Sequence, residues 1–276
     1  MRESIVRSEW LKKNLDDPNL IILDASPAGN QAGLTATFDG VGIPGTRIFD
    51  LKNSFSDPET DLPHMLPSIR QFERECRKLG INNSSKIIVY DHLGIYTSPR
   101  VWWMFRAMGH EQIAILDGGL PAWIAEEYET ESFKNKVFVP GDFSANFSMR
   151  SVKSLTDIAK NLHTKDSILI DARSQERFNG LAPEPRKGLG SGHIPKSINI
   201  PYETVLRNGK YKSKTELTAL FEEHDLGVRP LIFSCGSGVT ACIVLLASEQ
   251  VIKNTKSVFD GSWTQWASTE GLPIDK

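Results

Sequence analysis

The chain has 276 residues, of which 39% are hydrophobic and 24% are charged, and its formal net charge at pH 7 is -2. This composition is ordinary for a soluble globular protein, and a charge so near zero argues against general attraction to nucleic acid or to an anionic membrane. No apolar run approaches the roughly 18 residues that a membrane helix needs.

The three cysteines, Cys76, Cys235 and Cys242, are too few for a disulfide framework, and their spacings fit no zinc site. The N-terminal segment lacks the apolar core of a secretory signal. We therefore expect a cytoplasmic protein in a reducing compartment, with an organellar matrix as the alternative if a targeting segment has been removed.

Short apolar runs alternate with helical patterns along the first half of the chain. Ser68 and Gln71 have the spacing of a capping box, which predicts the start of one helix. The predicted strands are 20–24, 86–91 and a strand from 113 into the turn at 117–119, and the predicted helices are 8–17, 68–79, 99–108 and 120–127.

Much of this order returns about 145 residues later. The matching segments are 168–171 with 20–24, 192–195 with 42–44, 213–216 with 68–71, 231–235 with 87–91, and 257–262 with 114–119. Such a long period indicates duplicated domains, because the units of solenoids have about 20–50 residues. Alternating strands and helices predict an α/β fold with a mostly parallel sheet in each half.

The interval from Tyr128 to Arg150 is polar and irregular, with Pro140 and Gly141 in its middle. We therefore predict a first domain at 1–138, a linker at 139–150 and a second domain at 151–276. Each domain then has a normal size.

The region 230–242 carries the strongest chemical signal. A short apolar strand ends at Cys235, Gly236 and Gly238 allow a tight turn, and a buried helix follows from Val239. The N–H groups of such a loop and of a helix start favour negative charge at one point, which would stabilise a thiolate nucleophile. Ser237 and Thr240 could add hydroxyl donors. The alternative is a buried cysteine that only ends a strand.

A cysteine phosphatase is disfavoured. Such enzymes use an arginine six residues after the cysteine to clamp phosphate, and that position here is Ala241.

The run Cys235-Gly-Ser-Gly-Val-Thr-Ala241 resembles the active-site loop of the 3-mercaptopyruvate sulfurtransferases, which belong to the rhodanese superfamily. The resemblance implies two tandem rhodanese-like domains and a persulfide carried on the cysteine. It also implies substrate binding by the loop residues Gly236, Gly238, Val239 and Thr240. Asp91 occupies the position of Cys235 in the first half, so we expect that domain to be catalytically silent.

A long loop, 171–195, contains Arg173, Arg177 and Arg186. Arginine grips a carboxylate with two parallel hydrogen bonds. The resemblance implies that Arg177 and Arg186 hold the substrate carboxylate, while a surface salt bridge is the alternative for either one. Arg173 follows Asp171 closely and is interpreted as a structural brace.

The segment around His64 resembles the one that brings a histidine of the silent domain into a Ser-His-Asp relay. Ser237 would be the serine of this relay. The family's usual acid is replaced by Lys52, which leaves Asp57, Asp61 or no acid at all.

Other residues are interpreted as structural. Cys242 is expected in the core, and Cys76, among charged neighbours, is expected to be a partly exposed helical residue. The resemblance implies a structural hydrogen bond for His193.

The sequence therefore predicts transfer of sulfur from 3-mercaptopyruvate, through a persulfide on Cys235, to a thiol, to thioredoxin or to cyanide. Pyruvate would be released, and no metal or organic cofactor would be needed. Two alternatives stay open, a thiosulfate:cyanide sulfurtransferase and a non-catalytic persulfide carrier. The uncharged Gly236-Ser237 pair favours the first prediction, because thiosulfate-specific relatives typically have basic residues there.

Overall fold

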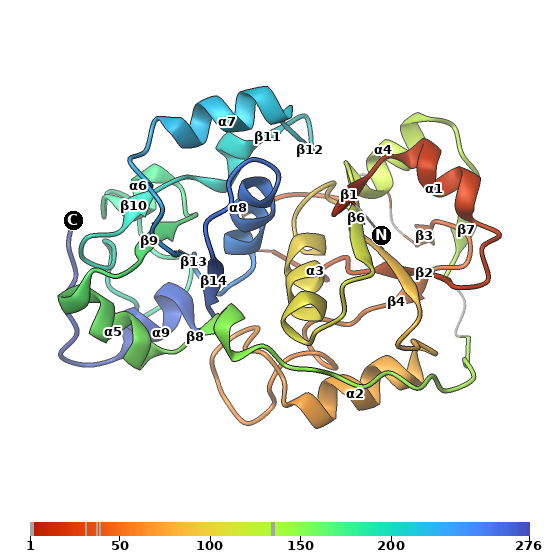
Figure 1. The fold of residues 1–276 in the computed structure, drawn as a ribbon, viewed down its shortest axis with the longest axis horizontal. Helices are drawn as coiled ribbons and strands as arrows, with labels where there is room; N and C mark the ends of the chain where they lie inside the picture. The colour runs from red at the N-terminus through yellow and green to blue at the C-terminus, as the bar shows by residue number, and fades with distance from the viewer. Residues whose placement is uncertain (1–2, 31, 37, 39, 134–135) are drawn as a thin grey trace. The chain divides into compact units, whose positions relative to one another are not determined.

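The computed structural model describes residues 3–30, 32–36, 38, 40–133 and 136–276 (Figure 1). Backbone contacts divide the chain into two compact units. The first unit comprises Met1–Glu59, Leu66–Ser148 and Asn208–Lys210, and the second comprises Thr60–Met65, Met149–Arg207 and Tyr211–Lys276.

The first unit is built on a five-stranded sheet with the order β1-β6-β5-β2-β4, and all of its strand pairs are parallel. A small antiparallel pair, β3 with β7, lies apart from it. The elements are β1 (Ile5–Val6), α1 (Ser8–Asn14), β2 (Leu20–Asp24), β3 (Val41–Gly42), β4 (Arg47–Ile48), α2 (Ile69–Lys78), β5 (Lys86–Tyr90), α3 (Ser98–Ala107), β6 (Ile113–Leu116), α4 (Gly119–Ala125) and β7 (Glu131–Ser132).

Both faces of this sheet are covered, which explains why its strands read as continuous apolar runs. One face packs against α1 and α4 around Leu11, Tyr90 and Trp123. The aromatic side chains of α2 and α3 pack together, and the rings of Phe72 and Phe105 are 5.0 Å apart.

Most of the predicted linker packs on this unit. The Phe143 ring is buried 5.7 Å from that of Phe72. The N–H of Phe143 donates to the carbonyl of Ile81 (3.2 Å), and that of Gly141 donates to the carbonyl of Arg77 (2.9 Å). One buried aromatic residue thus ties a polar, irregular segment to the first unit as far as Ser148.

The second unit repeats the plan with the sheet order β10-β9-β13-β14-β8, again parallel throughout. The prediction of two α/β units with mostly parallel sheets is confirmed. The elements are η1 (Met149–Ser151), β8 (Val152–Lys153), α5 (Leu155–Thr164), β9 (Ile168–Asp171), α6 (Gln175–Phe178), β10 (Ile198–Asn199), η2 (Tyr202–Val205), β11 (Leu206–Arg207), β12 (Lys210–Tyr211), α7 (Lys214–Glu222), β13 (Leu231–Ser234), α8 (Thr240–Glu249), β14 (Lys256–Phe259) and α9 (Ser262–Ser268).

One face of the second sheet packs against α5 and α9 around Ile232, Trp263 and Trp266. The helix α8 packs against β13 and carries α7 on its flank. Its residues from Ala241 to Ser248 are all buried. This burial on every side explains why the sequence of α8 is apolar throughout and has no amphipathic pattern.

The two predicted helix starts differ in detail. Ser213 and Glu216 form a complete capping box at α7. At α2, Ser68 accepts a hydrogen bond from the backbone of Gln71, but the Gln71 side chain donates to the carbonyls of Ser54 and Ser56, both at 2.9 Å. The amide therefore fastens a loop instead of closing a box.

The expectation that Cys76 is partly exposed is wrong. Its side chain is fully buried on the inner face of α2, and burial raises the pKa of its thiol well above the ordinary value. The charged neighbour Glu75 is buried as well, and its carboxylate pairs with Arg74 and Lys78. Within the described part of the chain, no helix is long and apolar enough to span a membrane.

Candidate active site

Cys235 stands at the carboxyl end of the central strand β13, which is flanked by β9 and β14. The chain turns through Gly236 to Val239, with Gly238 at a positive φ of 76°, and enters α8 at Thr240. Cys235 is 2% exposed. The predicted sequence of strand, tight loop and helix is therefore confirmed, and it lies where α/β sheets place their sites.

The first turn of α9 braces this loop. The N–H of Cys235 donates to Ser262 Oγ (3.2 Å), and the carbonyl of Cys235 accepts from the N–H of Trp263 (2.9 Å). The carbonyl of Gly236 accepts from both the N–H and the Oγ1 of Thr264, at 3.0 and 2.6 Å. The sequence pattern identified 257–262 only as a repeated segment and did not predict that Ser262 and Thr264 contact the cysteine loop.

The equivalent loop of the first unit shows what such a loop holds. The Asp91 carboxylate is fully buried, and its Oδ2 accepts from the N–H groups of Tyr96 (2.9 Å), Thr97 (3.0 Å) and Ser98 (2.9 Å). The Ser98 hydroxyl adds a bond of 2.7 Å, and the N–H of Leu93 donates to Oδ1 at 3.0 Å. This loop is an anion cradle filled by its own side chain.

The same bracing bond occurs in both units, since the N–H of Leu120 donates to the carbonyl of Asp91 (3.1 Å) as that of Trp263 does to Cys235. The internal repeat thus aligns Asp91 with Cys235 in structure as well as in sequence. An aspartate side chain offers no thiol, so no persulfide can form at this position of the first unit.

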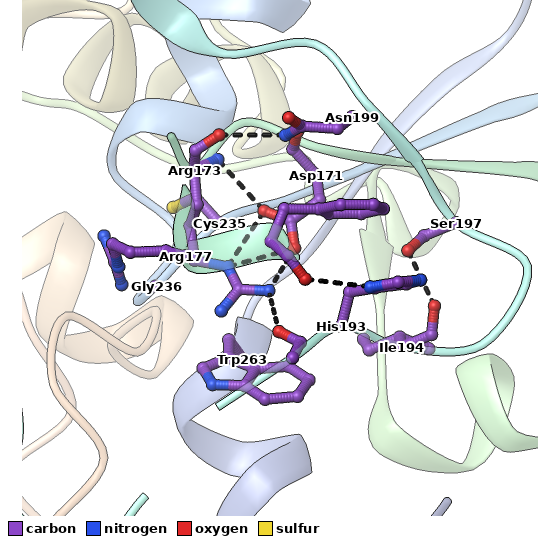
Figure 2. A network of polar contacts seen from close by, with 12 residues as sticks. Asp171, Arg173, Arg177, His193, Ile194, Ser197, Asn199, Cys235, Gly236 and Trp263 are labelled. Atoms are coloured by element: carbon purple, nitrogen blue, oxygen red, sulfur yellow. Dashed lines mark hydrogen bonds and ion pairs between the residues drawn. The ribbon is translucent and has the colours of Figure 1, made fainter. Parts of the chain in front are cut away.

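Arg173 is the predicted brace. Its side chain is fully buried and pairs with the Asp171 carboxylate through Nη2 at 2.6 Å (Figure 2). It also donates to the carbonyl of Gly192 (2.8 Å) and lies 4.3 Å from the centre of the Trp263 ring. These contacts tie the long loop to β9 and α9.

Arg177 and Arg186 converge on the cysteine loop. A Cβ placed on Gly236 would lie 3.2 Å from Arg177 Nη2 and 3.7 Å from Arg186 Nη1. Arg186 Nη2 donates to Ser237 Oγ at 3.3 Å. Figure 2 shows Arg177 reaching toward Gly236 beside Cys235. We name these two guanidinium groups the arginine pair.

Two carboxylates influence Arg177. Glu184, which sequence reasoning missed, pairs with Arg177 Nη2 at 2.6 Å and with Arg173 Nη1 at 2.9 Å. Burial raises the pKa of the Glu203 carboxyl, and the positive charge of Arg177 partly offsets this effect. The only hint in the sequence was the position of Glu184 between two arginines in a long loop.

The other predicted residues lie as follows. His193 Nδ1 is 2.9 Å from the carbonyl of Phe178, and the two rings stack, which agrees with a structural role. His64 has a positive φ of 61° and lies in Thr60–Met65, a segment grouped with the second unit. Asp57 Oδ1 accepts from the N–H of Glu59 (2.9 Å). No group of three or more His, Cys, Asp or Glu side chains among the described residues is arranged to hold a metal ion.

The arrangement combines a thiol in a loop of anion-cradle form with two guanidinium groups next to it. Such a site suits a small donor with an anionic end, because the guanidinium groups bind the charge while the thiol attacks.

Comparison with known proteins agrees with this geometry. A family model described as a rhodanese-like domain matches residues 8–126 and again 154–269. The "Thiosulfate/3-mercaptopyruvate sulfurtransferase 2" of Arabidopsis thaliana is 38% identical over 296 residues, covering 99% of this chain and 86% of the relative.

The "3-mercaptopyruvate sulfurtransferase" of Escherichia coli K12 is 38% identical over 275 residues, covering 98% of this chain and 97% of its own. The crystal structure of SseA from Escherichia coli superposes with a TM-score of 0.83 at 36% identity, covering 94% of this chain and 98% of that one. The resemblance drawn from the Cys235 loop is confirmed. The chain therefore belongs to the rhodanese superfamily and is a sulfurtransferase built from two rhodanese-like domains in tandem.

Proposed function

We propose that this sulfurtransferase takes sulfur from 3-mercaptopyruvate, carries it as a persulfide on Cys235 and passes it to a thiol acceptor, with pyruvate as the other product. The arginine pair beside Gly236 is the observation that supports this donor most directly. Two full-length relatives whose names contain 3-mercaptopyruvate support it as well.

In the first half-reaction the Cys235 thiolate attacks the sulfur atom of 3-mercaptopyruvate. A sulfur–sulfur bond forms, and the carbon–sulfur bond breaks with its electron pair moving to the three-carbon fragment. That fragment leaves as the enolate of pyruvate and takes up a proton. Arg177 and Arg186 hold the donor carboxylate, and the N–H groups of the loop Gly236–Thr240 stabilise charge on sulfur.

The role given to the loop is supported by the first unit. The N–H groups of Tyr96 and Thr97, which hold the Asp91 carboxylate, belong to the two residues before α3, and Gly238 and Val239 are the two residues before α8. The same N–H directions would surround a thiolate or persulfide at Cys235.

In the second half-reaction an acceptor thiolate, from a small thiol or from reduced thioredoxin, attacks the outer sulfur and releases the Cys235 thiolate. Cyanide would accept the same sulfur as thiocyanate. Two half-reactions through a covalent intermediate predict ping-pong kinetics. The cysteine itself is the carrier in this scheme, which calls for no metal or organic cofactor.

Ser237 and His64 complete the proposed site. The Ser237 hydroxyl is fixed by Arg186, so it lies beside the donor carboxylate as well as beside Cys235. We assign to His64 a part in proton transfer. The acid that would complete a Ser-His-Asp relay is Asp57 or Asp61, or the relay has no acid. The three cysteines are all unbridged thiols, which suits a reducing compartment such as the cytosol.

A second donor has a specific observation in its favour. The Arabidopsis relative carries thiosulfate in its name, and the arginine pair would attract a dianion too. The Gly236-Ser237 pair adds no cation beside the sulfur, so the proposal ranks thiosulfate below 3-mercaptopyruvate.

The test measures pyruvate release from 3-mercaptopyruvate with a thiol acceptor, and thiocyanate formation from thiosulfate and cyanide, for the native protein and Cys235→Ser. We expect the native protein to have a higher kcat/KM for 3-mercaptopyruvate than for thiosulfate. Cys235→Ser should turn over neither donor. Higher efficiency on thiosulfate would favour the second donor. Turnover of neither donor, with transfer of a preloaded persulfide to a partner protein, would favour the carrier.

A further inference from the structure

Glu184 is a buried carboxylate that the proposed chemistry does not use. Its side chain is 2% exposed, although it lies in the long loop after α6. Oε1 accepts from Arg173 Nη1 (2.9 Å) and from Arg177 Nε (3.1 Å), and Oε2 accepts from Arg177 Nη2 at 2.6 Å. A burial this deep for a glutamate is rare unless its charge is paired.

Arg173 alone does not account for Glu184. The Asp171 carboxylate already neutralises Arg173 through Nε and Nη2 at 2.6 to 3.1 Å. The two contacts of Glu184 with Arg177, at 3.1 and 2.6 Å, instead fix the Nε–Nη2 edge of that guanidinium. This ion pair is side-on and bidentate, so it sets the plane of the Arg177 guanidinium as well as its position.

This grip decides which way Arg177 faces. The Arg177 side chain is 22% exposed, so without a fixed partner it would sample several rotamers. Held by Glu184, its Nη2 also lies next to Gly236 in the cysteine loop. Glu184 is followed by Pro185, which restricts its backbone to extended angles, and then by Arg186. One short segment therefore supplies both the second guanidinium and the carboxylate that aims the first.

We propose that Glu184 is the positioning residue for Arg177 and that its negative charge tunes the site toward donors with a single carboxylate over dianionic donors. This inference deepens the proposed function and rests on it. Removal of the charge would loosen Arg177 and would also add one positive charge beside the loop. Both effects penalise 3-mercaptopyruvate relative to thiosulfate.

The test compares Glu184→Gln with Glu176→Gln. Both variants remove one negative charge, but Glu176 is an exposed residue of α6. We expect Glu184→Gln to raise KM for 3-mercaptopyruvate by about tenfold or more, the loss typical of a charge-assisted hydrogen bond, and to change kcat less. The ratio of kcat/KM for thiosulfate to that for 3-mercaptopyruvate should rise by about tenfold. Glu176→Gln should leave both values within about twofold.

Glu184→Asp keeps the charge on a shorter side chain and should restore part of the KM. A purely structural role would lower the melting temperature and reduce turnover of both donors equally, without changing their ratio. That result, or equal KM values in Glu184→Gln and Glu176→Gln, would overturn the inference. If Glu184→Gln fails to fold, the KM of Glu184→Asp decides, because a native value there overturns it too.

A binding measurement separates this inference from the proposed donor. Pyruvate is titrated into the native protein, Glu184→Gln and Glu176→Gln by calorimetry. Weaker binding in Glu184→Gln alone supports the role of Glu184 even if the native protein does not turn over 3-mercaptopyruvate. Equal pyruvate affinity in all three proteins counts against Glu184, even where 3-mercaptopyruvate proves to be the donor.

Discussion

The same substitution at two repeated positions should have different effects on stability. Asp24 ends β2 and Asp171 ends β9, and both carboxylates are nearly fully buried. Two residues later the first unit has Ser26 and the second has Arg173. Asp171 therefore faces a buried guanidinium, whereas Asp24 accepts from the N–H of Ser26 at 2.7 Å.

Asp171→Asn keeps the shape of the side chain but removes the charge that compensates Arg173. Breaking a buried ion pair from one side typically costs about 3–5 kcal/mol. Glu184 and the carbonyl of Gly192 still contact Arg173 at 2.9 and 2.8 Å. We therefore expect Asp171→Asn to lower the free energy of unfolding by about 3 kcal/mol, the lower end of this range.

Burial raises the pKa of Asp24, and the nearby Asp91 charge adds to this effect. The carboxyl group of Asp24 therefore binds its proton more tightly in the folded protein than in the unfolded chain. The contribution of Asp24 is most favourable below its unfolded pKa and declines as the pH rises toward the folded value. Asp24→Asn replaces the buried carboxyl with a neutral amide whose oxygen can still accept from the N–H of Ser26. We expect a change within about 1 kcal/mol, in either direction.

The assay is urea unfolding followed by tryptophan fluorescence, since both units contain buried tryptophans, with Asp16→Ala as an exposed control in the first unit. Equal losses for Asp171→Asn and Asp24→Asn would refute the reasoning, because only one position has a guanidinium to leave unpaired. A loss of several kcal/mol at Asp24 would show that its charge is compensated in the folded state.

Three further predictions concern the loops. Asp91→Ala leaves the N–H groups of Tyr96 and Thr97 without their acceptor. It should lower the free energy of unfolding by about 3 kcal/mol in the same urea assay. A loss as small as that of Asp16→Ala would contradict the stabilising role given to the bonds of the Asp91 carboxylate. Gly236→Ala places a methyl group 3.2 Å from Arg177 Nη2. The variant should raise KM for 3-mercaptopyruvate several-fold in steady-state kinetics, with little change in melting temperature. An unchanged KM would show that the donor binds elsewhere. Thr264→Val removes the 2.6 Å bond to the carbonyl of Gly236 and should lower both the free energy of unfolding, by about 1 kcal/mol, and kcat/KM. Thr269→Val, at the opposite end of α9 and away from the loop, should leave kcat/KM unchanged. Equal kinetics in both variants would show that the brace is not needed.

Several features followed from local sequence pattern alone. The apolar runs placed β2, β5 and β13 within a residue of their observed bounds, and the repeat aligned Asp91 with Cys235 correctly. Local pattern suffices here because a strand buried on both faces must be apolar throughout, and because the tight turn after Cys235 requires glycine.

Only the tertiary structure decided which distant side chains meet. Ser262 and Thr264 reach the Cys235 loop because β14 lies next to β13, so the helix that follows starts at the same edge of the sheet. The burial of Cys76 depended on which face of α2 turns inward. Glu184 could have paired with any of three nearby arginines, and its choice of Arg173 and Arg177 follows from the path of a loop whose residues have no periodic pattern. Sequence pattern records which residues must be buried, whereas strand order and loop path determine which of them touch.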